Sequence, residues 1–186
     1  METAAPLCGI DEAGRGPIAG PLVMAGVILH APLEGLNDSK KLTEKKREAL
    51  YARITANAAY HIVRFSAQQI DDDGISACLS KGLKEIMKVL GEADYLFDGN
   101  STFGVSGLRT QVKADADVPE VSAASILAKV TRDREMVALA DTYPQYGFEK
   151  HKGYGSAAHI EAIKTHGYSP VHRRSFRLKA LQPTLF

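Results

Sequence analysis

The sequence predicts an α/β fold with a mixed central β-sheet flanked by helices and a helical C-terminal extension. Two apolar runs, 7–11 and 22–29, are separated by a turn rich in glycine and proline, which predicts an opening β-hairpin. Segments with helical periodicity then alternate with short β-rich runs, as in α/β proteins. No Gly/Ser-rich or Pro-rich linker divides the 186 residues. We therefore expect one domain over 1–186, helical and basic from about residue 141.

The segments after the hairpin follow from local patterns. Good helix formers predict a helix from Thr43 to about Ala58, and β-branched and aromatic residues predict a strand from Tyr60 to Phe65. Apolar residues at helical spacing between Ile75 and Leu90 predict an amphipathic helix that ends near Gly91.

The second half continues this alternation. We expect strands at 95–98 and 108–113, followed by a helix from about Val121 to Ala140. A shorter helix is expected from Ser156 to His166, with Gly167 as its stop.

Composition excludes several classes of protein. Cys8 and Cys78 show neither C-x-x-C nor Cys/His ligand spacing, so we expect neither a disulfide framework nor a zinc site. The first residues lack a basic region leading into an apolar one, and no stretch reaches the roughly 18 apolar residues of a membrane span. We expect a cytoplasmic protein without a membrane partner, and a monomer.

Charge is distributed unevenly along the chain. Residues 149–186 hold seven Lys and Arg against two acidic residues, whereas the whole chain carries a net charge of only +1. A basic end on an acidic body suits a protein that binds phosphates at one place and cations at another. A basic tail that is merely exposed to water gives the same count.

Four acidic residues stand at or just after the ends of predicted strands: Asp11, Glu12, Asp98 and Asp115. Loops at strand ends converge in open α/β sheets, and carboxylates gathered there repel one another unless a cation neutralises them. Oxygen ligands without nearby His or Cys favour Mg²⁺ or Mn²⁺ over zinc. These residues are therefore a candidate divalent-metal site.

Two alternatives to this site remain open. A single Asp after a strand is more often a turn former or a helix cap than a ligand. Asp11 and Glu12 point to opposite sides of a continuing strand, so both serve one site only if the chain turns there. The acidic run 71–73 competes for the role, but we expect it to be structural because it precedes a helix, whose N-terminus favours acids.

The glycine-rich turn, residues 14–20, superficially resembles a dinucleotide-binding fingerprint. Its third glycine comes one residue late and an apolar β-rich run follows, so that interpretation fails. Gly14 and Gly16 let backbone amides approach a ligand closely, and Arg15 offers a planar donor for phosphate or sugar oxygens. A plain hairpin turn is the alternative.

Another candidate binding segment lies at 150–155. Here Tyr154 stands between two glycines and follows two lysines, a pattern typical of stacking on a sugar or base beside a phosphate backbone. Lys40 and Lys129 are further candidate phosphate contacts.

Together these residues resemble the ribonuclease HII family, the type 2 ribonucleases H, of bacterial type. The matching segments occur in the family's order and span nearly the whole chain: 10–17, 38–42, 97–100, 113–115, 122–129 and 151–155. The related type HIII enzymes carry lysine in place of Arg15 and an additional N-terminal domain, so Arg15 and the early position of the turn favour type HII.

The resemblance implies an RNase H-like fold whose basic C-terminal part helps to hold a duplex. It also implies that the four acids, Asp11, Glu12, Asp98 and Asp115, are the catalytic and metal-binding residues. Asp133 is a rival for the fourth place, but Asp115 follows the family's Lys-Ala-Asp motif.

The resemblance further implies the reaction. The family cuts the RNA strand of RNA/DNA hybrids and incises duplex DNA 5′ of single ribonucleotides, leaving a 3′-hydroxyl and a 5′-phosphate, with two Mn²⁺ or Mg²⁺ ions. Gly14, Arg15, Gly16 and Tyr154 match the elements that read the 2′-hydroxyl, which distinguishes RNA from DNA. The expected roles are ribonucleotide removal from DNA and primer removal.

Two rival functions remain. A nucleic-acid-binding module without catalysis accounts for the basic tail and the glycine turn, but gives no reason for four converging acids. A different enzyme of the same fold, such as a resolvase or a ribonuclease limited to long hybrids, also uses clustered acids, and its substrate preference would separate it.

The last five residues carry a separate motif. A terminal Gln-x-x-Leu-Phe, here Gln182, Leu185 and Phe186, resembles the peptide with which bacterial replication and repair proteins bind the sliding clamp. A packed or frayed tail is the alternative.

Overall fold

The computed structural model describes residues 4–36 and 41–181. Its five strands form one sheet in the order β3-β2-β1-β4-β5. The neighbours β1–β2 and β2–β3 are antiparallel, whereas β1–β4 and β4–β5 are parallel, so the sheet is mixed as predicted. The strands are β1 Leu7–Ala13, β2 Leu22–Leu29, β3 Ala58–Phe65, β4 Asp94–Asp98 and β5 Leu108–Gln111.

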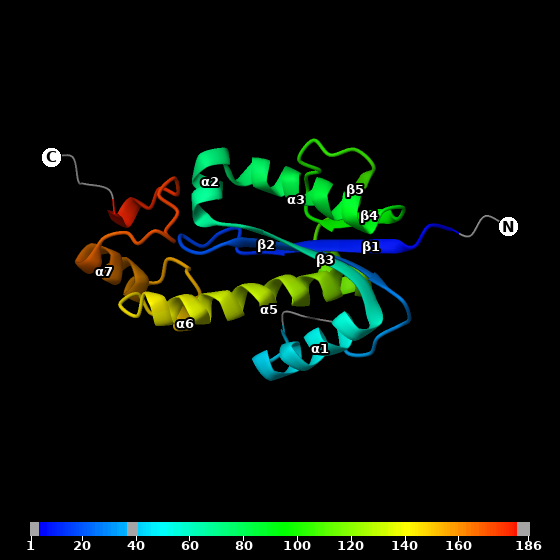
Figure 1. Ribbon diagram of the computed structural model, residues 1–186, viewed down its shortest axis with the longest axis horizontal. Coiled ribbons are helices and arrows are strands. Elements are labelled where there is room, and N and C mark those ends of the chain that lie inside the picture. The colour runs from blue at the N-terminus through cyan, green and yellow to red at the C-terminus, as the bar shows by residue number, and fades with distance from the viewer. Residues whose placement is uncertain (1–3, 37–40, 182–186) are drawn as a thin grey trace.

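Helices cover both faces of the sheet (Figure 1). The long helix α5 packs on β1 and β2 with α1 beside it, while α3 packs on β3 and β2 from the opposite face. The helices are α1 Glu44–Asn57, α2 Ala67–Asp73, α3 Ile75–Leu90, α4 Ala114–Asp117, α5 Pro119–Thr142, α6 Phe148–His151 and α7 Ala157–His166, followed by the 3-10 turn η2 Lys179–Leu181.

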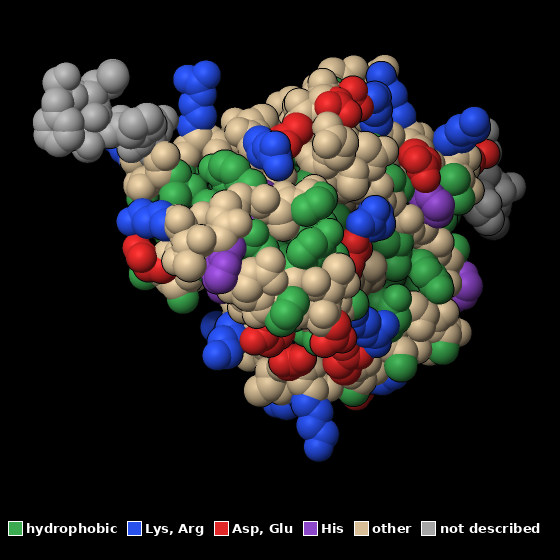
Figure 2. All heavy atoms as spheres, turned by 60° about the vertical axis from the view of Figure 1, so that its left-hand side comes forward, with side chains coloured by type: hydrophobic (Ala, Val, Ile, Leu, Met, Phe, Trp, Pro, Cys, Tyr) green, Lys and Arg blue, Asp and Glu red, His purple; other side chains and the backbone are tan. Residues whose placement is uncertain are grey.

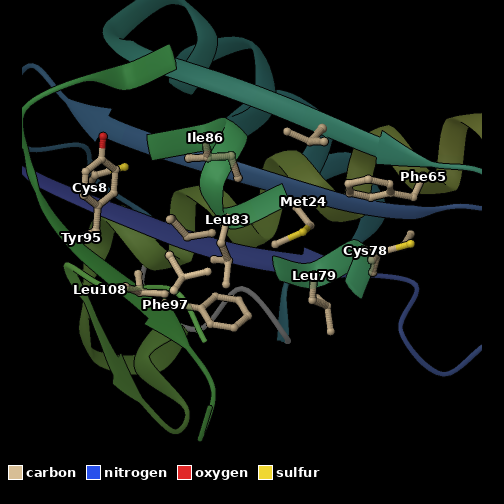
Figure 3. Close-up of a cluster of buried hydrophobic side chains, with 14 of the residues drawn as sticks. Cys8, Met24, Phe65, Cys78, Leu79, Leu83, Ile86, Tyr95, Phe97 and Leu108 are labelled. Carbon is tan, nitrogen blue, oxygen red and sulfur yellow. The ribbon is translucent and has the colours of Figure 1, made fainter. Parts of the chain in front are cut away.

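Strand β2 shows why helices are needed on both faces. Leu22 and Met24 join the core cluster under α3, and the alternate residues Val23 and Ala25 join the cluster under α5 and α1. Successive side chains of a strand point to opposite faces, so an almost wholly apolar strand must be buried on both. Figure 3 shows the first cluster, with Leu83 of α3 among the side chains of the strands.

Capping residues set several helix ends where the sequence predicted them. The Thr43 side chain accepts a hydrogen bond from the Lys46 N–H at the start of α1, and Ser156 does the same for His159 in α7. Gly167 ends α7 with a φ of 74°. Strand β5 is shorter than predicted and ends at Gln111. Lys113 then adopts a left-handed conformation, which turns the chain into α4.

The acidic run 71–73 directly precedes α3, which begins at Ile75, as the sequence analysis predicted. The run is also the last turn of α2, a helix that the sequence analysis missed. Ser66 and Gln69 form a capping box at the start of α2, which is a signal readable in the sequence. Acids at a helix C-terminus face an unfavourable dipole, and here hydrogen bonds offset it. Asp71 accepts them from the N–H groups of 174 and 175.

The chain after α5 is only partly helical. Residues 167–178 carry no helix and return to the β1–β2 connection, where Ala19 and His172 form an isolated antiparallel bridge. The N–H of Gly20 donates to the carbonyl of Val171 at 2.8 Å, and that of Arg173 to the carbonyl of Ile18 at 2.8 Å. The C-terminal segment thus holds the glycine-rich turn in place. Among the described residues, no helix has the length and hydrophobicity needed to cross a membrane.

Candidate active site

Three of the predicted acids meet at one edge of the sheet. Asp11 lies on β1, Asp98 ends the neighbouring parallel strand β4, and Asp115 lies in α4. One carboxylate oxygen from each residue lies within 4.8 Å of those of the other two. Parallel neighbours bring their carboxyl ends to the same edge, which explains how residues 87 positions apart become adjacent.

Asp98 also holds Asp115 in place. One Asp98 oxygen accepts a hydrogen bond from the Lys113 N–H and the other from the Asp115 N–H, each at 3.1 Å. These bonds tie the left-handed turn at Lys113 to the end of β4. A carboxylate that organises the backbone of its neighbour makes the cluster a preformed feature of the fold.

The rival acid Asp133 lies elsewhere. It is on α5, where its carboxylate forms an ion pair with Lys129 at 2.9 Å. Within the described residues it does not belong to the cluster of three. Asp115, and not Asp133, therefore lies with Asp11 and Asp98.

Glu12 lies beside the cluster but is not one of its three members among the described residues, and the turn that the sequence analysis required is absent. Strand β1 continues through Ala13, so Asp11 and Glu12 are successive residues of a regular strand. Glu12 Oε1 lies 3.6 Å from the Arg15 guanidinium. Its Oε2 is buried and has no hydrogen-bond partner among the described residues. An unpartnered buried carboxylate oxygen marks a place for a cation.

The pKa values of three carboxyl groups at the site are raised, so their ionised forms are disfavoured in the absence of a cation. Burial raises the pKa of Asp11 well above its usual range, and the nearby charges of Glu12 and Asp98 raise it further. Burial also raises the pKa of Glu12, against the opposing effect of Arg15, and the pKa of Asp98. An oxygen donor set of this kind fits a hard divalent cation, which would offset the repulsion.

A cavity of about 370 Å³ opens beside Glu12. It brings together candidates that are far apart in the sequence, and its lining includes Glu12, Gly14, Arg15, Gly16, Lys129 and Tyr154. The Tyr154 side chain is 49% exposed. The predicted contact Lys40 and the terminal motif residues Gln182, Leu185 and Phe186 lie outside the described residues.

Arg47 lines the same cavity and was missed by the sequence analysis. It lies in the first turns of α1, and its guanidinium donates to the carbonyl of Leu42 at 2.6 Å. The basic run 45–47 was the only sequence signal. Arg47 could be singled out only once α1 was placed beside α5.

The two glycines of the Gly-Arg-Gly turn serve different purposes. A Cβ on Gly14, whose φ is +88°, would lie 2.1 Å from Nε of the buried Arg132. A Cβ on Gly16 would meet only the Tyr154 ring, at 3.9 Å. Gly14 thus makes room for an internal side chain, whereas Gly16 leaves room in the cavity.

Arg15 is held from two sides. Besides Glu12, its guanidinium lies 5.2 Å from the ring centre of Phe103, within the range of a cation–π contact. Phe103 adopts a φ of 49°, which is rare for a bulky residue. The loop after β4 therefore contributes to placing Arg15.

The face shown in Figure 2 carries no single large charged patch. Lys and Arg side chains lie there among Asp and Glu side chains and small hydrophobic areas.

Comparison with known proteins identifies close relatives. The family model described as "Ribonuclease HII" matches residues 8–179. The ribonuclease HII of Sulfurovum sp. is 68% identical over 97% of this chain and 97% of its own length. That of Aliarcobacter butzleri is 58% identical over 94% and 92%, respectively.

Solved structures show the same fold. A chain in the structure of the PCNA:RNase HII complex from Archaeoglobus fulgidus superposes with a TM-score of 0.81 at 30% identity, covering 97% of this chain and 98% of that one. Bst-RNase HIII in complex with Mn²⁺ gives a TM-score of 0.75 at 16% identity, covering 93% of this chain and 67% of that one. The second likeness concerns the fold alone. With the mixed sheet and its covering helices, these matches confirm the predicted RNase H-like fold.

The acidic cluster, its fit to a divalent cation and the extent of the family match lead to one conclusion. This chain belongs to the ribonuclease HII family, of bacterial type, and is a metal-dependent endoribonuclease of the ribonuclease H class.

Proposed function

We propose that this enzyme cuts the RNA strand of RNA/DNA hybrids and incises duplex DNA on the 5′ side of single embedded ribonucleotides. The products are a 3′-hydroxyl and a 5′-phosphate. One observation carries the proposal: Glu12, the chain neighbour of Asp11 in the acidic cluster, lines the same cavity as Arg15, Gly16 and Tyr154. A nucleotide whose ribose lies in that cavity places its phosphate near the carboxylates. The role in the cell is the removal of ribonucleotides and primers from DNA.

The four acids, Asp11, Glu12, Asp98 and Asp115, would hold two divalent ions, Mg²⁺ or Mn²⁺. When bound, such ions supply an activated water and stabilise the charge on the departing 3′-oxygen. Asp98 keeps the peptide of Asp115 in position. Glu12, with one buried unpartnered oxygen, completes the ligand set. Mn²⁺ is the first ion to test, since Bst-RNase HIII was solved with it.

Recognition of the substrate would use the cavity wall. The backbone N–H groups of Arg15 and Gly16, together with the Tyr154 hydroxyl, are donors suited to a 2′-hydroxyl and the phosphate beside it. Lys129 and Arg47 border the same cavity and suit neighbouring phosphates. Lys40 and the basic C-terminal part would contact the duplex backbone further away.

The decisive experiment is cleavage of a labelled DNA duplex that contains one ribonucleotide. It is run with Mn²⁺, with Mg²⁺ and with chelator, beside an all-DNA duplex of the same sequence. We expect one metal-dependent cut on the 5′ side of the ribonucleotide and none in the control. Cleavage only of long hybrids would refute the single-ribonucleotide activity, and duplex binding without cleavage would favour the binding-module alternative.

We further propose that the enzyme is a monomer that docks on the sliding clamp through Gln182, Leu185 and Phe186. The solved complex of PCNA with the Archaeoglobus fulgidus enzyme supports clamp docking for a relative. Deletion of residues 182–186 should abolish capture by the bacterial clamp in a pull-down while leaving cleavage intact. Unchanged capture would refute this role of the terminal motif.

A further inference from the structure

Two arginine side chains are fully buried beneath the glycine-rich turn. Arg132 comes from α5 and Arg173 from the C-terminal segment, and each is only 1% exposed. Burial lowers the pKa of both, that of Arg173 to about 9. Because removing a guanidinium from water is costly, its burial has to be offset by good hydrogen bonds.

The two guanidinium groups donate six hydrogen bonds to backbone carbonyls. Arg173 donates to Gly14 at 2.5 Å, Arg15 at 3.2 Å and Gly20 at 2.9 Å. Arg132 donates to the carbonyls of Pro21 at 2.8 Å, Lys152 at 2.8 Å and Ala19 at 2.9 Å. Both limbs of the turn are thus tied to two rigid planar groups, and the bond to Lys152 ties the turn to the loop that carries Tyr154.

These bonds fix the direction of two N–H groups. The C=O and N–H of a trans peptide point in opposite directions. Since the carbonyls of Gly14 and Arg15 face Arg173, the N–H groups of Arg15 and Gly16 point away from it. In the described part of the chain, neither N–H has an acceptor. Both residues line the cavity, so two donors are left available there.

We propose that Arg173 and Arg132 are positioning residues for substrate recognition. They set the turn so that the N–H groups of Arg15 and Gly16 are ready for a ribose hydroxyl and its phosphate, at a fixed offset from Tyr154. This inference rests on the proposed function of the cavity. Lysine cannot replace either residue, because one ammonium cannot reach three carbonyls in a planar fork.

Gly14 is part of the same arrangement of the turn and the buried arginines. A side chain there would collide with Arg132, so the glycine and the buried arginine require each other. The Arg132 guanidinium also lies 5.9 Å from the Tyr154 ring centre. A single buried group therefore contacts both parts of the recognition surface.

The test is Arg173→Lys, with Arg109→Lys as the matched control on the exposed side of β5. Cleavage of the single-ribonucleotide duplex is measured at varied substrate concentration, alongside thermal unfolding. We expect KM to rise about tenfold or more, as for the loss of hydrogen bonds to a charged group, with kcat little changed. A purely structural role lowers kcat through loss of folded enzyme and leaves KM unchanged. The control should match the parent chain.

An unchanged KM in folded Arg173→Lys overturns the proposal. If that variant does not fold, Arg132→Lys and ¹⁵N relaxation of the parent chain decide. Backbone order parameters of about 0.85 are expected over residues 14–21, and values below about 0.6 would refute preorganisation. A parent chain that does not cleave refutes the proposed function, while the order parameters still test the positioning of the turn.

Discussion

The cost of gathering carboxylates is clearest at Asp11. Burial and the charges of three neighbouring carboxylates raise its pKa well above the usual range, so at neutral pH the protein without metal holds a group that resists ionisation. In the unfolded chain the same group ionises freely. The free energy of unfolding therefore decreases as the pH rises above the pKa that Asp11 has in the unfolded chain. It increases again when the pH falls or when a divalent ion binds.

Asp11→Asn should stabilise the metal-free protein while abolishing activity. Its Oδ1 can still accept the Glu12 N–H, which Asp11 accepts at 2.8 Å, so only the charge is lost. In chelator we expect the free energy of unfolding to rise by about 1–2 kcal/mol. Mg²⁺ should raise the unfolding temperature of the parent chain but not of the variant. Asp72→Asn on exposed α2 is the control. A variant that is destabilised in chelator, or still cleaves, contradicts this account.

Tyr154→Phe should weaken the preference for ribose. The side chain is half exposed, so removal of its hydroxyl leaves the fold intact. Loss of one hydrogen bond should cut cleavage of the single-ribonucleotide duplex by about tenfold. Tyr168→Phe removes a hydroxyl from another exposed tyrosine and should change nothing. Equal cleavage by the parent and Tyr154→Phe would remove Tyr154 from recognition.

The functional roles of some single residues can be predicted from the sequence, and those of others cannot. Asp11, Asp98 and Asp115 could be grouped because each follows a predicted strand, and strand ends converge. Arg132 and Arg173 could not, since five of their six carbonyl partners lie more than a hundred positions away. Nothing local distinguishes a buried arginine from an exposed one.

At the scale of elements, the apolar patterns predicted every strand because the sheet is buried on both faces. The boundaries at Thr43 and Gly167 follow from capping chemistry. Helix α2 escaped because it is seven residues long and its apolar side is too short to show periodicity. Its capping box was the one available signal.

Asp71→Ala should loosen the C-terminal segment from α2. The Asp71 carboxylate accepts the N–H groups of Arg174 and Ser175, at 2.9 and 3.0 Å. Because these bonds are exposed, we expect a loss of only about 1 kcal/mol, with faster hydrogen exchange confined to residues 174–181. Asp72→Ala, one residue further along α2, is the control. Uniformly faster exchange, or none, would show that Asp71 does not tether this segment.

At the scale of the whole molecule, the recognition surface joins distant parts of the chain. The turn after β1, the loop before α7 and residues 171–173 meet through Ile18, whose N–H donates to Gly153 and whose carbonyl accepts from Arg173. These three segments meet only in the complete tertiary structure. The sequence predicted the participants of the turn and Tyr154, but not the segment that joins them.

A chain of neutral histidines runs behind this surface. The Ser169 N–H donates to His172 Nδ1 at 2.9 Å, so His172 carries its proton on Nε2 and donates to His159 Nε2, also at 2.9 Å. His159 Nδ1–H then donates to the Tyr154 carbonyl at 2.8 Å. Burial lowers the pKa of each of these two histidines to about 4. Every donor and acceptor in the chain is matched only while both rings stay neutral.

Acid should therefore destabilise the whole molecule through these two rings. Their folded pKa of about 4 lies below the unfolded value of 6.5, so below pH 6.5 the unfolded state binds protons that the folded state excludes. Stability should fall by about 2 kcal/mol per histidine between pH 6.5 and 5, and the loss is complete below pH 4. His159→Gln keeps a donor and an acceptor without titrating, so its urea-unfolding free energy should vary less steeply with pH. The site carboxylates act in the opposite direction but are common to both proteins, so equal slopes would contradict the assignment.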